Sequence, residues 1–144
     1  MSLPGKSLQD IAIKVESNDT SSIGNIAALL AEISTMLEQL IGRGTSSMID
    51  LKSLPLSPQE YEQLRFTLGQ GEVTARLEAI GPSEIIETRY PGVWWVTHYN
   101  VEGDIIADMI EIASVPGILH SQPEDMRVGL ERLHELLPQY AQNK

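Results

Sequence analysis

The sequence contains no cysteine, and it is poor in both aromatic and basic residues. Without a thiol, these 144 residues form no disulfide and offer no thiolate ligand for zinc or for an iron-sulfur cluster. Ten basic against twenty acidic residues give a formal net charge of −10, which repels phosphate backbones and anionic lipid surfaces. We therefore expect no cofactor, and neither nucleic acid nor a membrane as a partner.

Long apolar runs are also missing. No stretch reaches the roughly 18 to 20 apolar residues of a membrane helix, and the first residues lack the basic and then apolar pattern of a signal peptide. We therefore expect a cytoplasmic protein. A length of 144 residues with 42% apolar and 21% charged residues is typical of one folded domain. We expect an N-terminal arm at residues 1–20 and a single domain at residues 21–144.

Three segments have the features of helices. Residues 22–41 carry apolar side chains at helical spacing: Ile23, Ile26, Ala27, Leu30, Ile33, Leu37, Leu40 and Ile41. A second helix is expected to begin at the capping box of Ser57 and Glu60 and to end at Gly69. A third is expected to begin after Ser121 and to end near Pro138. Its apolar stripe is Met126, Leu130, Leu133 and Leu137. We expect the first and third stripes to lie in the core.

Five further segments have the composition of strands. They are residues 48–52, 73–79, 85–90, 93–99 and 105–113. A short additional strand is predicted at residues 11–15, where apolar residues alternate. Runs of strands segregated from helices predict an α+β fold, with a mostly antiparallel sheet of about five strands and three helices packed on one face.

The segment from Glu87 to Asn100 holds both tryptophans of the chain. We predict that Pro91-Gly92 forms a two-residue hairpin turn, which pairs Arg89 with Trp94. Because neighbouring strand residues point to opposite faces, Trp95 would lie in the core and Trp94 would point outward. The outward face would then form a partner-binding surface made of Trp94, Arg89, His98, Glu87 and Arg76. The alternatives are that the arm or a helix covers Trp94, or that Arg89 stacks on it as a cation-π pair.

No catalytic constellation is evident. The three histidines lie in three different segments without metal-ligand spacing, and no nucleophile elbow occurs. Carboxylate pairs such as Glu84 with Glu87, or Asp108 with Glu111, are common on solvated surfaces. We expect a protein that is not an enzyme and has no metal site. Two alternatives stay open: a small enzyme using His98 with a nearby carboxylate, and a structural module that self-associates through an edge strand.

Several motifs together resemble the HupH/HyaF family of hydrogenase expression and formation proteins. They span residues 25–133, and the most specific is Pro91-Gly92-Val93-Trp94-Trp95-Val96. The others are Gly24-Asn25-Ile26, Ile49-Asp50-Leu51-Lys52-Ser53-Leu54-Pro55-Leu56, Leu68-Gly69-Gln70-Gly71-Glu72-Val73, Gly81-Pro82-Ser83-Glu84-Ile85 with Glu87-Thr88, Ile110-Glu111-Ile112 and Val115-Pro116-Gly117-Ile118-Leu119.

The resemblance implies an accessory role in the maturation of nickel-iron uptake hydrogenase. It implies a chaperone or scaffold that binds a hydrogenase subunit, the small iron-sulfur one, and works with other maturation proteins. Many members of this family are about twice as long, with extra sequence before this region. If the outward face binds the client, Trp94→Ala should weaken capture with little loss of stability.

Overall fold

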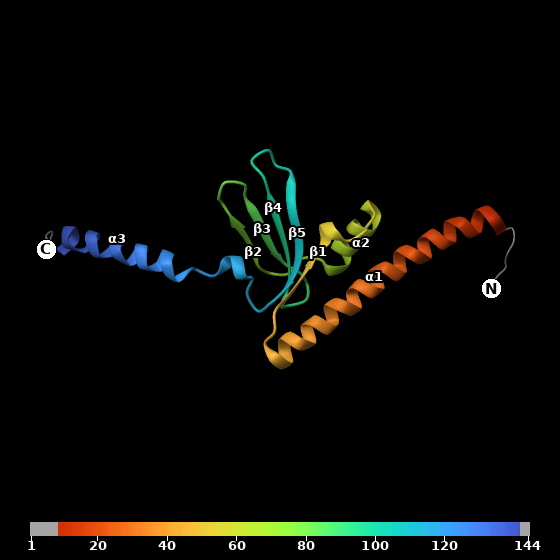
Figure 1. Ribbon diagram of the computed structural model, residues 1–144, viewed down its shortest axis with the longest axis horizontal. Helices are drawn as coiled ribbons and strands as arrows, with labels where there is room; N and C mark the ends of the chain where they lie inside the picture. Colours follow the sequence, from red (N-terminus) through yellow and green to blue (C-terminus); the bar gives the residue numbers. More distant parts are fainter. Residues whose placement is uncertain (1–8, 142–144) are drawn as a thin grey trace. The chain divides into compact units, whose positions relative to one another are not determined.

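This computed structural model describes residues 9–141. The described chain divides into two compact units, one ending at Ser114 and the other beginning at Val115. The first unit holds two helices, a short 3-10 helix and five strands (Figure 1). In chain order these are α1 (Gln9–Arg43), β1 (Ser47–Asp50), η1 (Leu51–Ser53), α2 (Pro58–Leu68), β2 (Thr74–Leu77), β3 (Ser83–Glu87), β4 (Val93–Tyr99) and β5 (Ile105–Ile112). The second unit holds η2 (Gly117–Leu119) and α3 (Pro123–Ala141).

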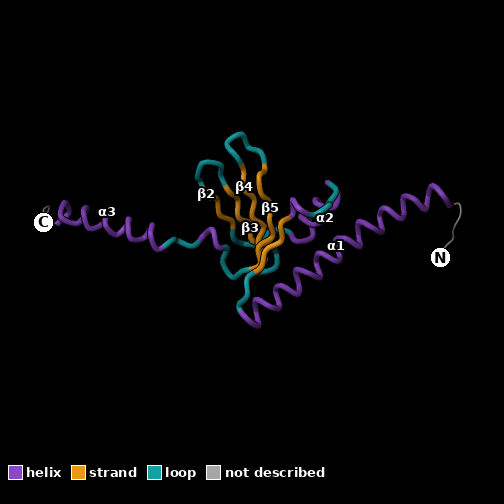
Figure 2. Tube along the Cα trace, viewed as in Figure 1, coloured by secondary structure: helices purple, strands orange, loops and turns teal. Residues whose placement is uncertain are grey.

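The five strands form one antiparallel sheet in the order β1-β5-β4-β3-β2, which confirms the predicted α+β class (Figure 2). Hairpins connect β2 to β3, β3 to β4 and β4 to β5, so these neighbours in sequence are also neighbours in the sheet. The strands β1 and β2 are its two edges. Both have four residues, and short edge strands offer little backbone for pairing with another chain.

The helices α1 and α2 bury their apolar side chains against one face of the sheet. The residues of this core are Ile26, Leu29 and Ile33 of α1, Leu64 and Leu68 of α2, and Ile49, Leu51, Val93, Trp95, Ile110 and Ile112 of the sheet and η1. Full burial of one such side chain contributes about 1.5 to 3 kcal/mol. A polar contact also joins the helices, because Asn25 Nδ2 donates to Glu60 Oε2 at 2.9 Å. The first predicted stripe therefore lies in the core at Ile26 and Ile33. Ala27 and Ile41 of that stripe are exposed, and Leu29, which was not predicted, is buried.

The ends of α2 follow the sequence prediction. Ser57 and Glu60 form the predicted capping box, in which each side chain bonds the backbone of the other residue. The hydrogen bond from the Ser57 backbone, followed by that from Asn25, lowers the pKa of Glu60. The helix ends at Gly69, whose φ of +65° favours glycine. Just beyond this end, the backbone N–H of Arg89 donates to the carbonyl of Leu68 at 2.8 Å and ties α2 to the β3–β4 turn.

The turn between β3 and β4 is longer than predicted. Pro91 and Gly92 do form a β-turn, in which the N–H of Val93 donates to the carbonyl of Tyr90. However, the Thr88 hydroxyl donates to the Val93 carbonyl at 2.8 Å and accepts from the Tyr90 N–H, which closes the hairpin at Thr88. The predicted register is therefore wrong by two residues: Trp94 lies opposite Glu87, and not opposite Arg89. Because the register shift is two residues, each side chain of β3 and β4 stays on its predicted face of the sheet.

Two other predictions about helices need correction. The short strand predicted at residues 11–15 lies within α1, which begins at Gln9, so residues 9–20 of the expected arm are helical. The intrinsic strand preference of β-branched residues yields to context, and a strand also needs a partner. Within its own unit the apolar stripe of α3 is exposed, because α3 has no buried residue and Leu133 is 58% accessible. The α3 helix also runs past Pro138 to Ala141.

Candidate functional site

The predicted outward surface does not exist as an exposed patch. Trp94 is 6% exposed and packs with Ile85 and Val96 in a second buried cluster, on the sheet face opposite Trp95. Its indole N–H donates to the carbonyl of Ala113 at 3.0 Å, so its polar atom is also satisfied. The exposure predicted for Trp94 is wrong, because β4 is buried on both faces. We therefore expect Trp94→Ala to destabilise the fold, contrary to the sequence-based prediction.

Glu87 and His98 lie on the same face as Trp94, and their contacts stabilise the fold. Glu87 Oε1 accepts from the backbone N–H groups of Glu72 and Val73, at 3.1 and 3.2 Å, and so fixes the entry into β2. His98 Nδ1 lies 2.6 Å from the hydroxyl of the buried Ser83, which is its cross-strand neighbour. This contact joins β4 to β3.

Arg76 and Arg89 belong to a different surface. The register aligns Arg76 with Glu84 and Glu84 with Thr97, so Arg76 lies on the face that carries Trp95. The alternative in which Arg89 stacks on Trp94 is not observed. The cation-π pair among the described residues is formed by Arg65 of α2, which lies 4.7 Å from the ring centroid of Trp95. The five predicted residues are therefore divided between the two faces of the sheet and the β3–β4 turn.

A buried carboxylate that sequence reasoning placed on a solvated surface lies beneath α2. Asp108 of β5 is 3% exposed. Its Oδ1 accepts from the Trp95 indole N–H at 2.7 Å and from the Thr97 hydroxyl at 2.9 Å, and its Oδ2 accepts from the Tyr61 hydroxyl. These three donors offset the cost of burying the carboxylate. The sequence held one signal for it, because Asp108 alternates with the core residues Ile110 and Ile112.

The same cluster holds the aromatic rings in place. Tyr61 meets Trp95 edge to face with ring centroids 5.4 Å apart, and Arg65 covers the indole ring. Burial, and then the hydrogen bond and negative charge of Asp108, raise the pKa of Tyr61 to about 12. The tyrosine therefore stays protonated at neutral pH and acts as a fixed donor to Asp108.

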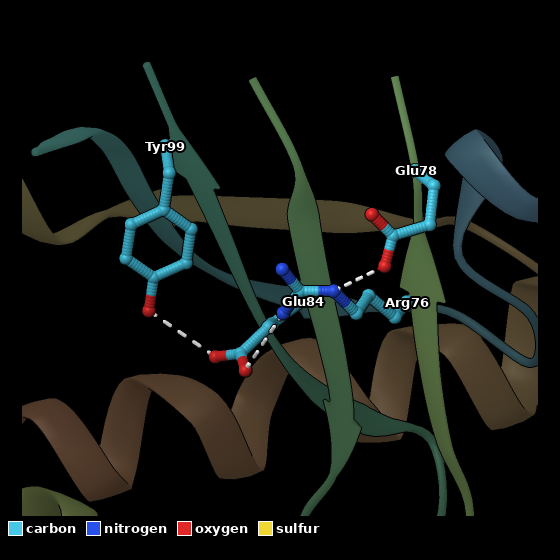
Figure 3. A network of polar contacts seen from close by, with 4 residues as sticks. All are labelled: Arg76, Glu78, Glu84 and Tyr99. Carbon is cyan, nitrogen blue, oxygen red and sulfur yellow. Dashed lines mark hydrogen bonds and ion pairs between the residues drawn. The ribbon is translucent and has the colours of Figure 1, made fainter. Parts of the chain in front are cut away.

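A polar network follows on the same face, toward the β2 edge (Figure 3). Arg76 forms ion pairs with Glu78 and, at 3.7 Å, with Glu84. The Tyr99 hydroxyl donates to the other oxygen of Glu84 at 3.1 Å. Burial, and then the hydrogen bond to Glu84, raise the pKa of Tyr99, while the charge of Arg65 opposes this shift. The charge of Arg65 thus acts on both tyrosines, Tyr61 and Tyr99.

A pocket of about 230 Å³ opens between the C-terminal end of α2 and strand β3. Its walls combine two guanidinium groups with apolar surface. The lining residues are Arg65, Phe66, Gly69, Gln70, Ile86, Arg89 and Trp95. We call this pocket, together with the adjoining residues Arg76, Glu84 and Tyr99, the α2–β3 surface. Phe66 is 77% exposed at its rim.

The pair of His98 and Ser83 is not arranged as in a serine triad. In a serine triad the histidine uses Nε2 to activate the serine and Nδ1 to hold the carboxylate. In this chain Ser83 occupies Nδ1 of His98, and Ser83 itself is buried.

Among residues 9–141 there is also no group of three or more histidine, aspartate or glutamate side chains placed to hold a metal ion. None of the helices within that range is long and apolar enough to cross a membrane.

Comparison with known proteins gives a consistent set of relatives. The model of the family described as "HupH hydrogenase expression protein, C-terminal conserved region" matches residues 23–140. The hydrogenase expression/formation protein HoxQ of Cupriavidus necator is 34% identical over 113 residues, which are 78% of this chain and 40% of that protein. The hydrogenase expression/formation protein HupH of Rhodobacter capsulatus is 30% identical over 118 residues, 82% of this chain and 42% of that protein.

A solved structure is similar over most of its length. The hydrogenase expression protein HupH from Thiobacillus denitrificans ATCC 25259 is 40% identical, with a TM-score of 0.78. The match covers 81% of this chain and 97% of that one. By contrast, this chain spans about two-fifths of the length of the curated relatives above.

Proposed function

Because this chain belongs to the HupH family of hydrogenase expression proteins, we propose that it binds a hydrogenase subunit as a chaperone or scaffold before the enzyme is assembled. The match of residues 23–140 to the family model carries this proposal. The client that we propose is the small, iron-sulfur subunit of a nickel-iron uptake hydrogenase, and the place of binding is the cytoplasm. The protein itself performs no catalysis.

The composition supports a protein that holds a client subunit, and not one that carries the iron-sulfur cluster of that subunit. Iron-sulfur clusters are held mainly by cysteine thiolates, and these 144 residues contain none. The protein can therefore shield a subunit while other proteins supply the metal centre. The net charge of −10 also favours a client with a basic surface over an acidic one.

We place the client on the α2–β3 surface. Arginine and aromatic residues are enriched at the centres of protein interfaces, and this surface combines Arg76 and Arg89 with the exposed ring of Phe66. Of the five residues predicted from the sequence, Arg76 and Arg89 stay in the proposal. The other three residues stabilise the fold; they are Trp94, Glu87 and His98.

Co-purification tests the proposed function. The tagged chain would be co-expressed with the large and small subunits of an uptake hydrogenase, each present alone or together. We expect the small subunit to be recovered in the absence of the large one. Recovery of neither subunit by a folded chain would contradict the function, and recovery of the large subunit alone would contradict the choice of client.

A pair of apolar substitutions tests the position of the client. Phe66→Ala should reduce recovery of the subunit, whereas Ile80→Ala should not, because Ile80 lies in the turn between β2 and β3 and does not line the pocket. Both side chains are highly exposed, at 77% and 95%, so neither change should affect stability by more than about 0.5 kcal/mol. Equal recovery with both variants would move the client to another part of the molecule.

A further inference from the structure

The pocket beside the end of α2 brings two guanidinium groups together. Arg65 and Arg89 both line it, in a chain that has twice as many acidic as basic residues. Among the residues that the structure describes, neither guanidinium forms an ion pair with a carboxylate. By comparison, Arg76 and Arg127 each have an acidic partner.

The surroundings of the two arginines hold Arg65 in place and leave room for Arg89. Arg65 lies over the Trp95 ring, which is itself fixed by its hydrogen bond to Asp108. Arg89 crosses the end of α2 directly over Gly69, where a Cβ atom would lie 2.3 Å from Arg89 Nε. Gly69 therefore leaves the space that the Arg89 side chain occupies. Groups that are held before binding lose less conformational entropy when a ligand arrives.

We propose that this pocket binds an acidic side chain, glutamate or aspartate, presented by an extended segment of a partner protein. Guanidinium groups recognise carboxylates with paired, charge-assisted hydrogen bonds. The apolar walls formed by Ile86 and Phe66 suit the methylene groups of such a side chain and an apolar neighbour. The inference rests on the proposed role in protein binding and specifies how one part of the partner is recognised.

The size of the pocket limits the ligand. Pockets for cofactors and other small molecules usually measure about 300 to 1,000 Å³. A volume of 230 Å³ is below that range and suits one side chain. If the carboxylate of a chain terminus entered the pocket, the side chain of the last residue would have to enter the same space. We therefore assign the ligand as an acidic side chain within a segment, and not as a C-terminal carboxylate.

NMR titration of the isotope-labelled 144-residue chain tests this assignment. The probe is the blocked tripeptide acetyl-Leu-Glu-Leu-amide, and its neutral counterpart contains glutamine. The indole N–H of Trp95 reports on the pocket, and that of Trp94, on the opposite face, is the internal control. We expect saturable shifts of the Trp95 and Arg89 side-chain signals, an unchanged Trp94 signal, and binding of the glutamine peptide at least about tenfold weaker.

Variants connect the shifts to the two guanidinium groups. Arg89→Gln should weaken binding by about tenfold or more, whereas Arg132→Gln in α3 removes the same charge and should leave it unchanged. Arg65→Lys keeps the charge but loses the planar fork, so it should also weaken binding. An unmoved Trp94 signal in each variant shows that the fold is intact.

Three results would overturn the inference. They are equal binding of the glutamate and glutamine peptides, unchanged binding by Arg89→Gln, and tighter binding of acetyl-Leu-Gln-Leu with a free C-terminus. The second result would mean that the two arginines do not bind a ligand and that their charges only stabilise the C-terminal end of α2. Since the titration uses no hydrogenase subunit, its failure would leave the co-purification result unaffected, and the converse also holds.

Discussion

The helices α1 and α3 carry similar apolar stripes, but only α1 has a covering surface within its own unit. In α1 the stripe residues Ile26, Leu29 and Ile33 are 4 to 6% exposed, because the sheet and α2 present a matching apolar surface. In α3 the corresponding residues Leu130 and Leu133 are 52% and 58% exposed. Helical spacing thus indicates which residues share a face. It does not indicate whether a second surface exists to bury that face.

The largest expected effect comes from removing part of the surface against which α1 packs. Trp95→Ala deletes a ring that is 3% exposed and contacts Tyr61, Arg65 and Asp108. We expect the free energy of unfolding to fall by about 3 to 5 kcal/mol, measured by urea denaturation. The variant also leaves the carboxylate of Asp108 without one of its donors, which adds to the loss. A loss below about 1 kcal/mol would show that the stripe of α1 does not depend on this core.

A matched pair of truncations tests the comparison directly. Ile33→Ala in α1 removes a buried side chain, so we expect a loss of about 2 to 5 kcal/mol. Leu133→Ala in α3 removes an exposed one, so we expect a change within about 0.5 kcal/mol. Urea melts of both variants under the same conditions give the difference. Equal losses would mean that the α3 stripe is covered in solution, and the contrast between the helices would then fail.

This contrast also indicates how far the sequence predicts the fold. The boundaries of α2 follow from local chemistry, namely the box of Ser57 and Glu60 and the positive φ of Gly69. The faces of β4 follow from strict alternation, and Trp95 does lie in the core beneath α1 and α2. These two features, which residues a few positions apart determine, were therefore predicted well, whereas the register of the β3–β4 hairpin and the strand at residues 11–15 were not.

Features that depend on distant segments were predicted poorly. The exposure of Trp94 was wrong because alternation separates two faces without stating whether the second one is covered. The continuous apolar run Val93–Val96 was the available signal, since such runs are typical of strands buried on both faces. Asp108 was missed because its three partners come from α2 and β4, and the pocket of Arg65 and Arg89 depends on where α2 ends against the β3–β4 turn.

A pH titration would weaken the α2 side of this core. The pKa of Tyr61 is about 12 in the folded chain, against about 10 in an unfolded one. Between these values the unfolded chain has released the proton and the folded chain keeps it, so the free energy of unfolding falls as the pH rises from about 10 to about 12. Because Tyr61 is partly exposed, we expect a loss of about 1 kcal/mol after allowance for solvent screening.

The control for this titration is Tyr61→Phe, which keeps the ring but removes the titrating group. Urea melts across the same pH range should show a flatter dependence for the variant than for the parent chain. Tyr99 contributes a loss of the same sign, because its pKa is also raised. Identical pH profiles for the two proteins would show that the bond from Tyr61 to Asp108 does not influence stability.

The smallest effect, and the most selective, comes from the glycines within the two helices. Gly24 in α1 and Gly129 in α3 both have room for a Cβ atom, with no atom within 4 Å of it. Replacing a helical glycine by alanine favours the helix by about 0.5 to 1 kcal/mol, because glycine loses more backbone entropy.

Since α1 is packed on the core, Gly24→Ala should raise the free energy of unfolding of the first unit by that amount. Gly129→Ala should raise the helical circular dichroism of α3 and leave the main urea transition in place. If Gly129→Ala shifted that transition as much as Gly24→Ala, the unfolding of α3 would be coupled to that of the sheet, and its exposed stripe would need a partner within the same molecule.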